Sequence, residues 1–442
     1  MKSLLLLLNA AVAFSAFAGE LYVPDHPRRD KPNFTDWSEI VVPVNYDDAK
    51  ADKYRKLDIL REIGGTGKIV SARQWLDSER PKIIKFLETE QFGKIPPRPA
   101  KIEFKLVEQS DNALGGIAAR RQYKIISTDT NGTHTFNVLL YYPKNASKSR
   151  PVPCFVYPNY AGNHTASDEP EVLFPEPDAW IRNNEMCKVS DNKAHEYQRG
   201  THLSRHPNAE IVARGYAVAT FCYCELYPDI ENGDDLMLEK SVYKIFDRNA
   251  IDANPTSIPA WAWGNCRTPF IARDKIGVAG HSRLGKTALF SAVCDQRFAM
   301  AVSNSSCAGG ASMALHDYGE NFKFAARHFT RWYQPKMIEY GDNPEKLPID
   351  AQHFIAAIAP RKVFVLSGTK DYWADPKGEF LSLMEAAKIY ALFGVKKMPT
   401  MDDFRIKTPF IGEGFGYVLY DGPHQIDAYN WQQILNFADK SY

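Results

Sequence analysis

The residues best suited to chemistry lie between Lys275 and Leu289, in the stretch K-I-G-V-A-G-H-S-R-L-G-K-T-A-L. Residues 276–279 form a short, mainly apolar run of the length of a buried strand, and a pattern typical of a helix start follows Ser282. A serine between a strand and a helix is held on a tight turn, with its hydroxyl exposed beside the N–H groups of the first helical turn. This nucleophile elbow predicts a hydrolase. The alternative is an ordinary turn in which the serine only caps the helix.

Two glycines flank this serine, and we expect both to allow the strand and the helix to approach closely. Gly280 and Gly285 lack the Cβ atoms that would collide at such a turn. The usual elbow is G-x-S-x-G, whereas here the second glycine stands one residue late.

A serine nucleophile needs a base to take its proton, and the base needs an acid to hold its tautomer. In α/β-hydrolases the chain order is serine, acid, histidine. Of the four histidines after Ser282, we expect His424 to be the base, because it lies in a loop just before the C-terminal helix. His316 and His328 come too early, and His353 precedes a buried strand. The alternative role of His424 is that of a helix-capping loop residue.

The acid is expected in the loop after the next-to-last strand of the sheet, residues 362–366. Asp371 is the first carboxylate in that loop and Asp375 the second. Asp375 precedes Pro376 and is expected to cap the following helix. The residue types and order therefore predict a triad with Asp371 as its acid.

Buried strands and helices must alternate to position these side chains, and such alternation is typical of an α/β protein with a mostly parallel, doubly wound sheet. Earlier segments predict a helix with Ser71 at its cap, a half-buried strand from Ile102 to Leu106, and an antiparallel edge. The expected buried strands are residues 152–157, 216–222, 276–279, 298–302, 362–366 and 417–420, the edge strands are 122–127 and 135–142, and the expected helices include 71–90, 257–266, 376–392 and 426–437.

Composition excludes some classes of function. The chain has 442 residues, 44% of them hydrophobic, and a formal net charge of +1, so no strong field draws it to nucleic acid or to an anionic membrane.

His202 and His206 are four residues apart, but no convincing third ligand stands near them, and we expect no metal and no cofactor. The seven cysteines are an odd number, and a chain of this length needs no disulfides to stabilise its core.

Residues 1–18 have the features of a signal peptide. Lys2 gives a positive start, an apolar core follows, and Ala16-Phe17-Ala18 is an A-x-A cleavage site. We expect an exported protein, periplasmic or secreted, without a membrane-spanning segment. Residues 19–442 would then form a single catalytic domain, whose first part, to about residue 100, wraps the surface.

Several motifs together resemble the bacterial glucuronoyl esterases, carbohydrate esterase family 15. The resemblance spans nearly the whole chain after the signal peptide, and the late-glycine elbow followed by lysine, together with W-A-D-P, is its most specific part. The matching motifs are G-H-S-R-L-G-K at 280–286, S-N-S-S-C-A-G-G-A at 303–311, Gly319-Glu320, D-Y-W-A-D-P-K-G-E-F at 371–380 and G-P-H at 422–424.

The resemblance implies an α/β-hydrolase fold, a three-layer sandwich, with Ser282 and His424 in the catalytic roles given above. It implies that Arg283 stabilises the oxyanion through its backbone N–H and its guanidinium. It also implies that Lys286, Glu320 and Trp373 hold the glucuronoyl sugar; without it, the expected roles are a helix-surface lysine, a solvated glutamate and a packing tryptophan.

One position departs from the family pattern. Many members carry the acid just after the strand that follows the elbow, where this chain has Ser305. A serine cannot supply the charge that stabilises an imidazolium. Other bacterial members have their acid after the later strand, which matches Asp371.

The resemblance implies hydrolysis of esters that join 4-O-methyl-glucuronic acid on xylan to lignin alcohols. The expected partner is therefore a glucuronoxylan or lignin–carbohydrate ester, bound by a monomer. Two alternatives stay open: another carbohydrate ester hydrolase such as an acetyl xylan esterase, and a weakly active carbohydrate-binding relative, which the serine at position 305 keeps possible.

Overall fold

A computed structural model describes residues 44–147, 149–230, 236–268 and 274–441. The predicted signal peptide, residues 1–18, lies outside the described residues. Within them, no helix is long and apolar enough to cross a membrane. All seven cysteines are described, and each is a free thiol.

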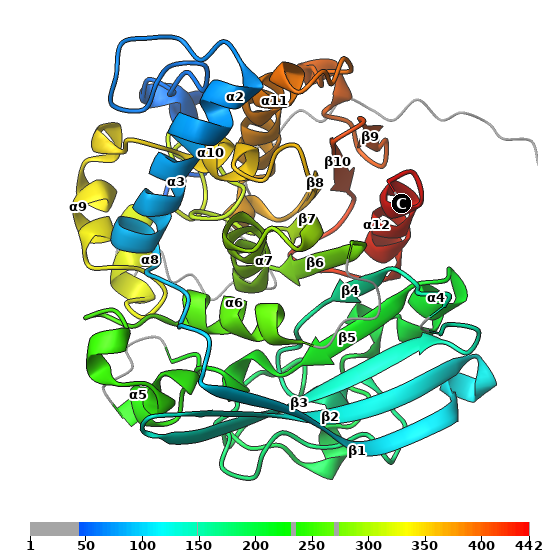
Figure 1. Ribbon diagram of the computed structural model, residues 1–442. Coiled ribbons are helices and arrows are strands. Elements are labelled where there is room, and N and C mark those ends of the chain that lie inside the picture. The colour runs from blue at the N-terminus through cyan, green and yellow to red at the C-terminus, as the bar shows by residue number, and fades with distance from the viewer. Residues whose placement is uncertain (1–43, 148, 231–235, 269–273, 442) are drawn as a thin grey trace, which may run out of the picture.

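The fold is built on one 10-stranded sheet, in the order β1-β2-β3-β5-β4-β6-β7-β8-β10-β9 (Figure 1). The six strands from β5 to β10 in this order pair in parallel, and antiparallel pairs lie at both ends. The strands are β1 Lys101–Ala113, β2 Ala118–Asp129, β3 Gly132–Pro143, β4 Cys154–Val156, β5 Ala217–Phe221, β6 Ile276–His281, β7 Phe298–Asn304, β8 Lys362–Gly368, β9 Phe410–Ile411 and β10 Phe415–Tyr420.

Helices cover both faces of this sheet, which makes a three-layer α/β sandwich and confirms the predicted fold class (Figure 1). One apolar core lies under α6, α7, α10 and α11, and a second lies under α4 and α12 on the opposite face. The α-helices are α2 Ala72–Gln74, α3 Arg80–Phe86, α4 Asn208–Ala213, α5 Leu236–Glu239, α6 Ser257–Arg267, α7 Arg283–Cys294, α8 Phe322–His328, α9 Lys336–Asp342, α10 Ala351–Ala356, α11 Pro376–Leu392 and α12 Ala428–Asp439.

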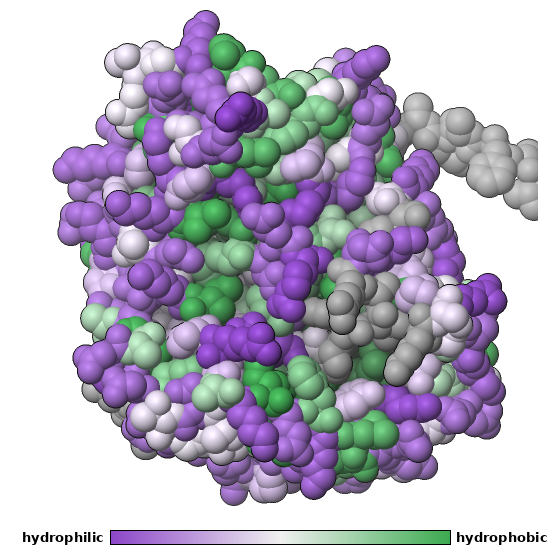
Figure 2. All heavy atoms as spheres, in the orientation of Figure 1, coloured by the Kyte–Doolittle hydropathy of each residue, from purple (hydrophilic) through white to green (hydrophobic). Residues whose placement is uncertain are grey.

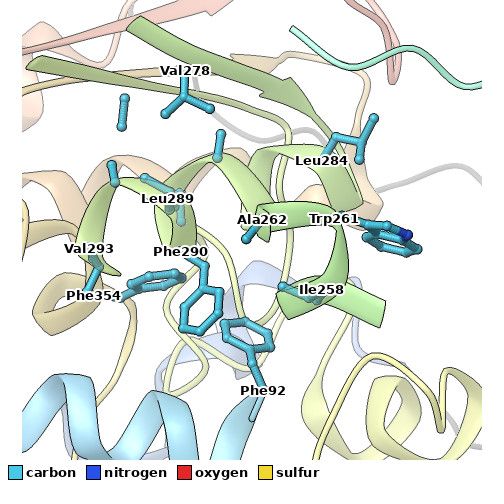
Figure 3. Packing of buried hydrophobic residues seen from close by; sticks show 14 of the residues in the cluster. Phe92, Ile258, Trp261, Ala262, Val278, Leu284, Leu289, Phe290, Val293 and Phe354 are labelled. Atoms are coloured by element: carbon cyan, nitrogen blue, oxygen red, sulfur yellow. The ribbon is translucent and has the colours of Figure 1, made fainter. Parts of the chain in front are cut away.

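Helix α7, which starts at the predicted elbow, is packed on both sides by apolar side chains. Figure 3 shows it between Val278 of β6 and residues of α6. The ring of Phe290 meets that of Phe92 with centroids 5.2 Å apart, and both side chains are fully buried. Burial of such a ring is worth about 1.5–3 kcal/mol. The position of the elbow is therefore fixed by the core on both faces of its helix.

Two early predictions need correction. The segment 101–106 was expected to be half-buried, but in β1 Phe104 is 48% exposed and Leu106 is 43% exposed. The reason is its place in the fold: β1 is an edge strand paired only with β2 within the described residues. The helix expected over 71–90 is present but contains two π-helical turns, Trp75–Glu79 and Leu87–Gln91.

The outer surface in the view of Figure 2 is mostly hydrophilic, with apolar residues in scattered patches. This pattern is that of an ordinary globular surface.

Candidate active site

Ser282 stands at the junction of β6 and α7 with φ 57° and ψ −129°, a backbone conformation that L-residues seldom adopt. Its N–H donates to the carbonyl of Asn304 over 2.8 Å, which ties the turn to the end of β7. A Cβ on Gly280 would lie 1.9 Å from the carbonyl oxygen of Leu284, and a Cβ on Gly285 would lie 2.9 Å from the Cβ of Ser306. Both glycines are therefore needed for the close approach, as predicted.

His424 and Asp371 meet beside this turn, although the chain separates them by 53 residues. His424 Nδ1 and Asp371 Oδ2 are 2.6 Å apart. A carboxylate only accepts, so Nδ1 is the donor in this contact. The imidazole is 31% exposed whereas the carboxylate is fully buried. The pair thus joins a partly exposed imidazole to a fully buried carboxyl group.

His281, the residue before Ser282, links the elbow to His424. The two rings have centroids 4.4 Å apart. His281 Nδ1 lies 2.5 Å from Asn304 Oδ1, and its carbonyl accepts a 2.5 Å hydrogen bond from the Tyr160 hydroxyl. Burial, followed by the charge of His424, lowers the pKa of His281 well below its usual range. The neighbour of His424 is therefore a neutral imidazole.

Asp375 and Ser305, the other positions considered for the acid, contact other residues than His424 within the described part of the chain. Asp375 caps α11 by accepting from the N–H of Gly378, as predicted, and its other oxygen accepts from Ser312 and from His316 over 2.9 Å each. The Ser305 hydroxyl lies 3.0 Å from the hydroxyl of Tyr420.

The remaining histidines after the elbow, His328 and His353, lie in α8 and α10. The His353 Nδ1 accepts from the backbone N–H of Asp350 and thereby helps to cap α10. Of these later histidines, His424 is the one that the structure joins to Asp371.

Arg283, the first residue of α7, reaches a buried carboxylate. Its Nη1 donates to Asp229 Oδ2, and its guanidinium carbon lies 4.7 Å from the ring centroid of Trp332. The Arg283 side chain is still 18% exposed, whereas that of Asp229 is 1% exposed. The guanidinium is therefore partly exposed, whereas its counter-ion is buried.

Lys286, Glu320 and Trp373 are brought together from three separate segments. Glu320 accepts from Lys286 Nζ and from Trp373 Nε1 through its two oxygens, over 2.8 Å each. The Lys286 and Glu320 side chains are 1% and 4% exposed, and Trp373 is half-buried. Without the resemblance, Lys286 was expected on the helix surface and Glu320 in solvent. Both expectations were wrong, because both side chains are buried.

Gly319 explains how the loop of Glu320 reaches Trp373. It has φ +63°, and a Cβ there would lie 2.5 Å from the carbonyl oxygen of Trp373. The N–H of Glu320 donates to the same carbonyl over 2.8 Å. Two loops from different parts of the chain are therefore in direct contact.

No group of three or more His, Cys, Asp or Glu side chains suited to a metal ion occurs among the described residues. The rings of His202 and His206 have centroids 6.0 Å apart, and both are nearly fully buried.

Sequence reasoning missed three neighbours of the predicted residues: Asp229, Trp332 and Tyr420. Asp229 and Trp332 lie in long irregular connections, where no periodicity or motif marked them. Tyr420 ends a correctly predicted strand, but nothing in the sequence indicated that its hydroxyl would meet that of Ser305. Only their spatial contacts single them out.

Comparison with known proteins gives a consistent assignment. A family model described as glucuronyl esterase, fungi, matches residues 208–394. The chain is 35% identical over 407 residues to carbohydrate esterase MZ0003 from an unknown prokaryotic organism, with 89% of this chain and 91% of that relative covered.

Two solved structures are similar over nearly their whole length. A promiscuous CE15 esterase from a marine bacterial metagenome has a TM-score of 0.78 and 32% identity, with 90% of this chain and 100% of that chain covered. A glucuronoyl esterase from Solibacter usitatus has a TM-score of 0.78 and 31% identity, with 89% and 99% covered. The chain therefore belongs to carbohydrate esterase family 15, the glucuronoyl esterases, and is a carboxylic ester hydrolase.

Proposed function

We propose that this protein hydrolyses glucuronoyl esters through a serine triad, with Ser282 as nucleophile, His424 as base and Asp371 as acid. The observation that carries the proposal is the 2.6 Å contact between His424 Nδ1 and Asp371, next to a serine held at φ 57°. Strained backbone of this kind gathers at catalytic sites, and the elbow is its usual setting in α/β-hydrolases.

The proposed proton path starts from the contact between His424 and Asp371. Asp371 holds the proton of His424 on Nδ1, so Nε2 takes the proton of Ser282 as its oxygen attacks the ester carbonyl. The imidazolium formed is stabilised by the buried carboxylate and then protonates the leaving alcohol. Water repeats the sequence on the acyl-enzyme and releases the uronic acid.

Arg283 is proposed as the oxyanion donor. Arg283 directly follows Ser282 in the chain, and its charged side chain is only 18% exposed, so solvent screens the charge little. A donor of this kind is worth roughly 3 kcal/mol of transition-state stabilisation.

The sugar would be held by Lys286, Glu320 and Trp373. The half-buried Trp373 can offer an apolar face to a pyranose ring, and Glu320 joins it to the buried Lys286. The substrate class proposed is an ester of 4-O-methyl-glucuronic acid on xylan with a lignin alcohol. No observation on the site favours an acetyl ester.

The serine at position 305 does not argue for an inactive relative. Since Asp371 meets His424, a carboxylate is in the position that the base requires. We further propose a catalytic domain over residues 19–442, acting as a monomer after export and removal of residues 1–18.

The test is release of glucuronic acid from its benzyl ester by the wild type and by Ser282→Ala. We expect the variant to lose turnover by about 10⁶-fold, as for serine hydrolases that lose their nucleophile, while its melting temperature stays close to that of the wild type. An acetylated xylo-oligosaccharide serves as the comparison substrate. Retained turnover of the benzyl ester by Ser282→Ala would exclude the proposed mechanism, and faster release of acetate by the wild type would exclude the proposed substrate class.

A further inference from the structure

The carboxylate of Asp229 gathers donors from four parts of the chain. Its Oδ2 accepts from Arg283 Nη1 and, over 2.6 Å, from the Tyr223 hydroxyl. Its Oδ1 accepts from Trp332 Nε1 over 2.9 Å. Arg182 adds an ion pair at 3.5 Å and donates to the backbone carbonyl of Asp229 over 2.9 Å.

This network leaves the carboxylate with almost no freedom. Asp229 is 1% exposed, and each of its two carboxylate oxygens accepts a hydrogen bond from a side chain of another segment. Burial by itself would raise the pKa of Asp229, but the positive charge of Arg283, and then that of Arg182, more than offset it and lower the pKa. The group is therefore ionised, and it is a fixed acceptor for the guanidinium.

The same network restrains the guanidinium from a second side. Trp332, which donates to Asp229, also presents its ring face to Arg283, with 4.7 Å between the guanidinium carbon and the ring centroid. One hydrogen bond and one contact with a ring face together restrain a long, flexible side chain. Arginine carries about 2 kcal/mol of side-chain rotamer entropy, which such restraint removes before the reaction begins.

We propose that Asp229 is a positioning residue for Arg283: it holds the guanidinium in place for the oxyanion before substrate binds. This inference rests on the proposed role of Arg283 in the reaction. Electrostatic stabilisation depends on donors that need no reorganisation when charge develops. Without Asp229, the Arg283 side chain would lose its conformational freedom only when the transition state forms. The cost of this ordering should therefore lower kcat and leave KM nearly unchanged.

The experiment is a double-mutant cycle on the benzyl ester with Asp229→Asn, Arg283→Ala and the combined variant. We expect Asp229→Asn to lower kcat roughly 10- to 100-fold with KM within about threefold, because a displaced donor costs less than the 10²–10³ of a removed one. In the Arg283→Ala background the same change should lower kcat by less than about threefold, since the arginine that it positions is gone.

Glu225→Gln is the matched control. Glu225 is another nearly buried carboxyl on the same connection, and it accepts from the backbone N–H of Glu176 without touching Arg283. We expect the kcat of Glu225→Gln to stay within about twofold of the wild-type value. A purely structural role for Asp229 would instead give equal factors in both backgrounds of the cycle, and that result, or a kcat of Asp229→Asn close to the wild type, overturns the proposal.

If Asp229→Asn does not fold, Tyr223→Phe carries the test, because it removes a single donor from the Oδ2 that Arg283 also uses. Its kcat should fall several-fold in the wild type and stay unchanged in the Arg283→Ala background; equal falls overturn the proposal. The outcome is separable from that of the proposed function: turnover that depends on Ser282 but is insensitive to Asp229 and to Tyr223 removes this inference alone.

Discussion

At the scale of single residues, the proposed acid of the triad is chosen by which side chain contacts His424. Ser305 follows β7, where many family members carry their acid, but its hydroxyl meets Tyr420 at 3.0 Å. Asp371 follows β8 and meets His424. Both residues follow neighbouring strands of the sheet, since β7 and β8 are adjacent and β8 is adjacent to β10.

The matched pair Asp371→Asn and Ser305→Ala tests this assignment. The amide cannot hold the proton on His424 Nδ1 or stabilise the imidazolium, so we expect kcat to fall by about 10⁴-fold, as when the acid of a serine triad becomes an amide. Ser305→Ala loses only a hydroxyl contact with Tyr420 and should keep kcat within about threefold. Steady-state kinetics on the benzyl ester decide; a large loss in Ser305→Ala with little change in Asp371→Asn would reverse the assignment.

At the scale of elements, Glu379 joins α11 to the ends of two strands. Its fully buried carboxyl accepts from the N–H of Ser306 over 2.6 Å and from the Ser367 hydroxyl over 2.5 Å. Burial raises the pKa of Glu379 from 4.5 to about 8, with smaller contributions from the charges of Asp371 and Asp375. Glu379 is therefore neutral at pH 7, which avoids burying a further negative charge.

This shift predicts a pH-dependent stability. The folded state binds the proton of Glu379 more tightly than the unfolded chain does, so the stabilisation is complete below pH 4.5 and is lost as the pH rises through about 8. The slope for one such group is at most about 1.4 kcal/mol per pH unit. Glu379→Gln keeps an acceptor and a donor without the charge, and it should remove this part of the pH dependence.

Urea unfolding at pH 5 and pH 8.5 provides the measurement. The free energy of unfolding of Glu379→Gln relative to the wild type should rise between the two pH values. Glu385→Gln, on the same helix, alters a carboxylate that only pairs with Lys388 near the surface and should show no such rise. An equal pH response in Glu379→Gln and in the wild type would mean that this carboxyl does not titrate in that range.

At the scale of the whole molecule, the site depends on a sheet covered on both faces. Helices α7 and α11 position Ser282 and the loop of Asp371 from one face, and the segment before α12 carries His424. The strands between β4 and β10 are buried on both sides, which explains why their sequences are continuous apolar runs rather than alternating ones.

The proposed export also belongs to this scale. Expression of the full chain in a Gram-negative host should yield a periplasmic protein that begins at Gly19, which intact mass and N-terminal sequencing would establish. Ala18→Arg removes the small residue at the cleavage site and should leave the precursor uncut, whereas Lys50→Arg, beyond that site, should be processed normally. Wild-type protein that keeps residues 1–18 in the periplasm would contradict the proposal.

Much of the fold could be predicted because it is encoded by near neighbours in the chain. The boundaries of α11 were predicted at Pro376 and Leu392, where Asp375 and proline mark the start. The strands β6, β8 and β10 were found from short apolar runs. The exposure of β1 could not be predicted, since alternation of residue types does not tell an edge strand from a covered one.

The sequence by itself determined the strand–turn–helix at Ser282 and the elements that carry the proposed acid and histidine, because each depends on residues within a turn or two. Only the tertiary structure decided that Asp229, 54 residues before Arg283, would hold its guanidinium, and that Glu320 would join Lys286 to Trp373. Such pairs form where loops from distant segments meet. Strand order and packing decide which loops meet, and a local sequence pattern does not encode either of them.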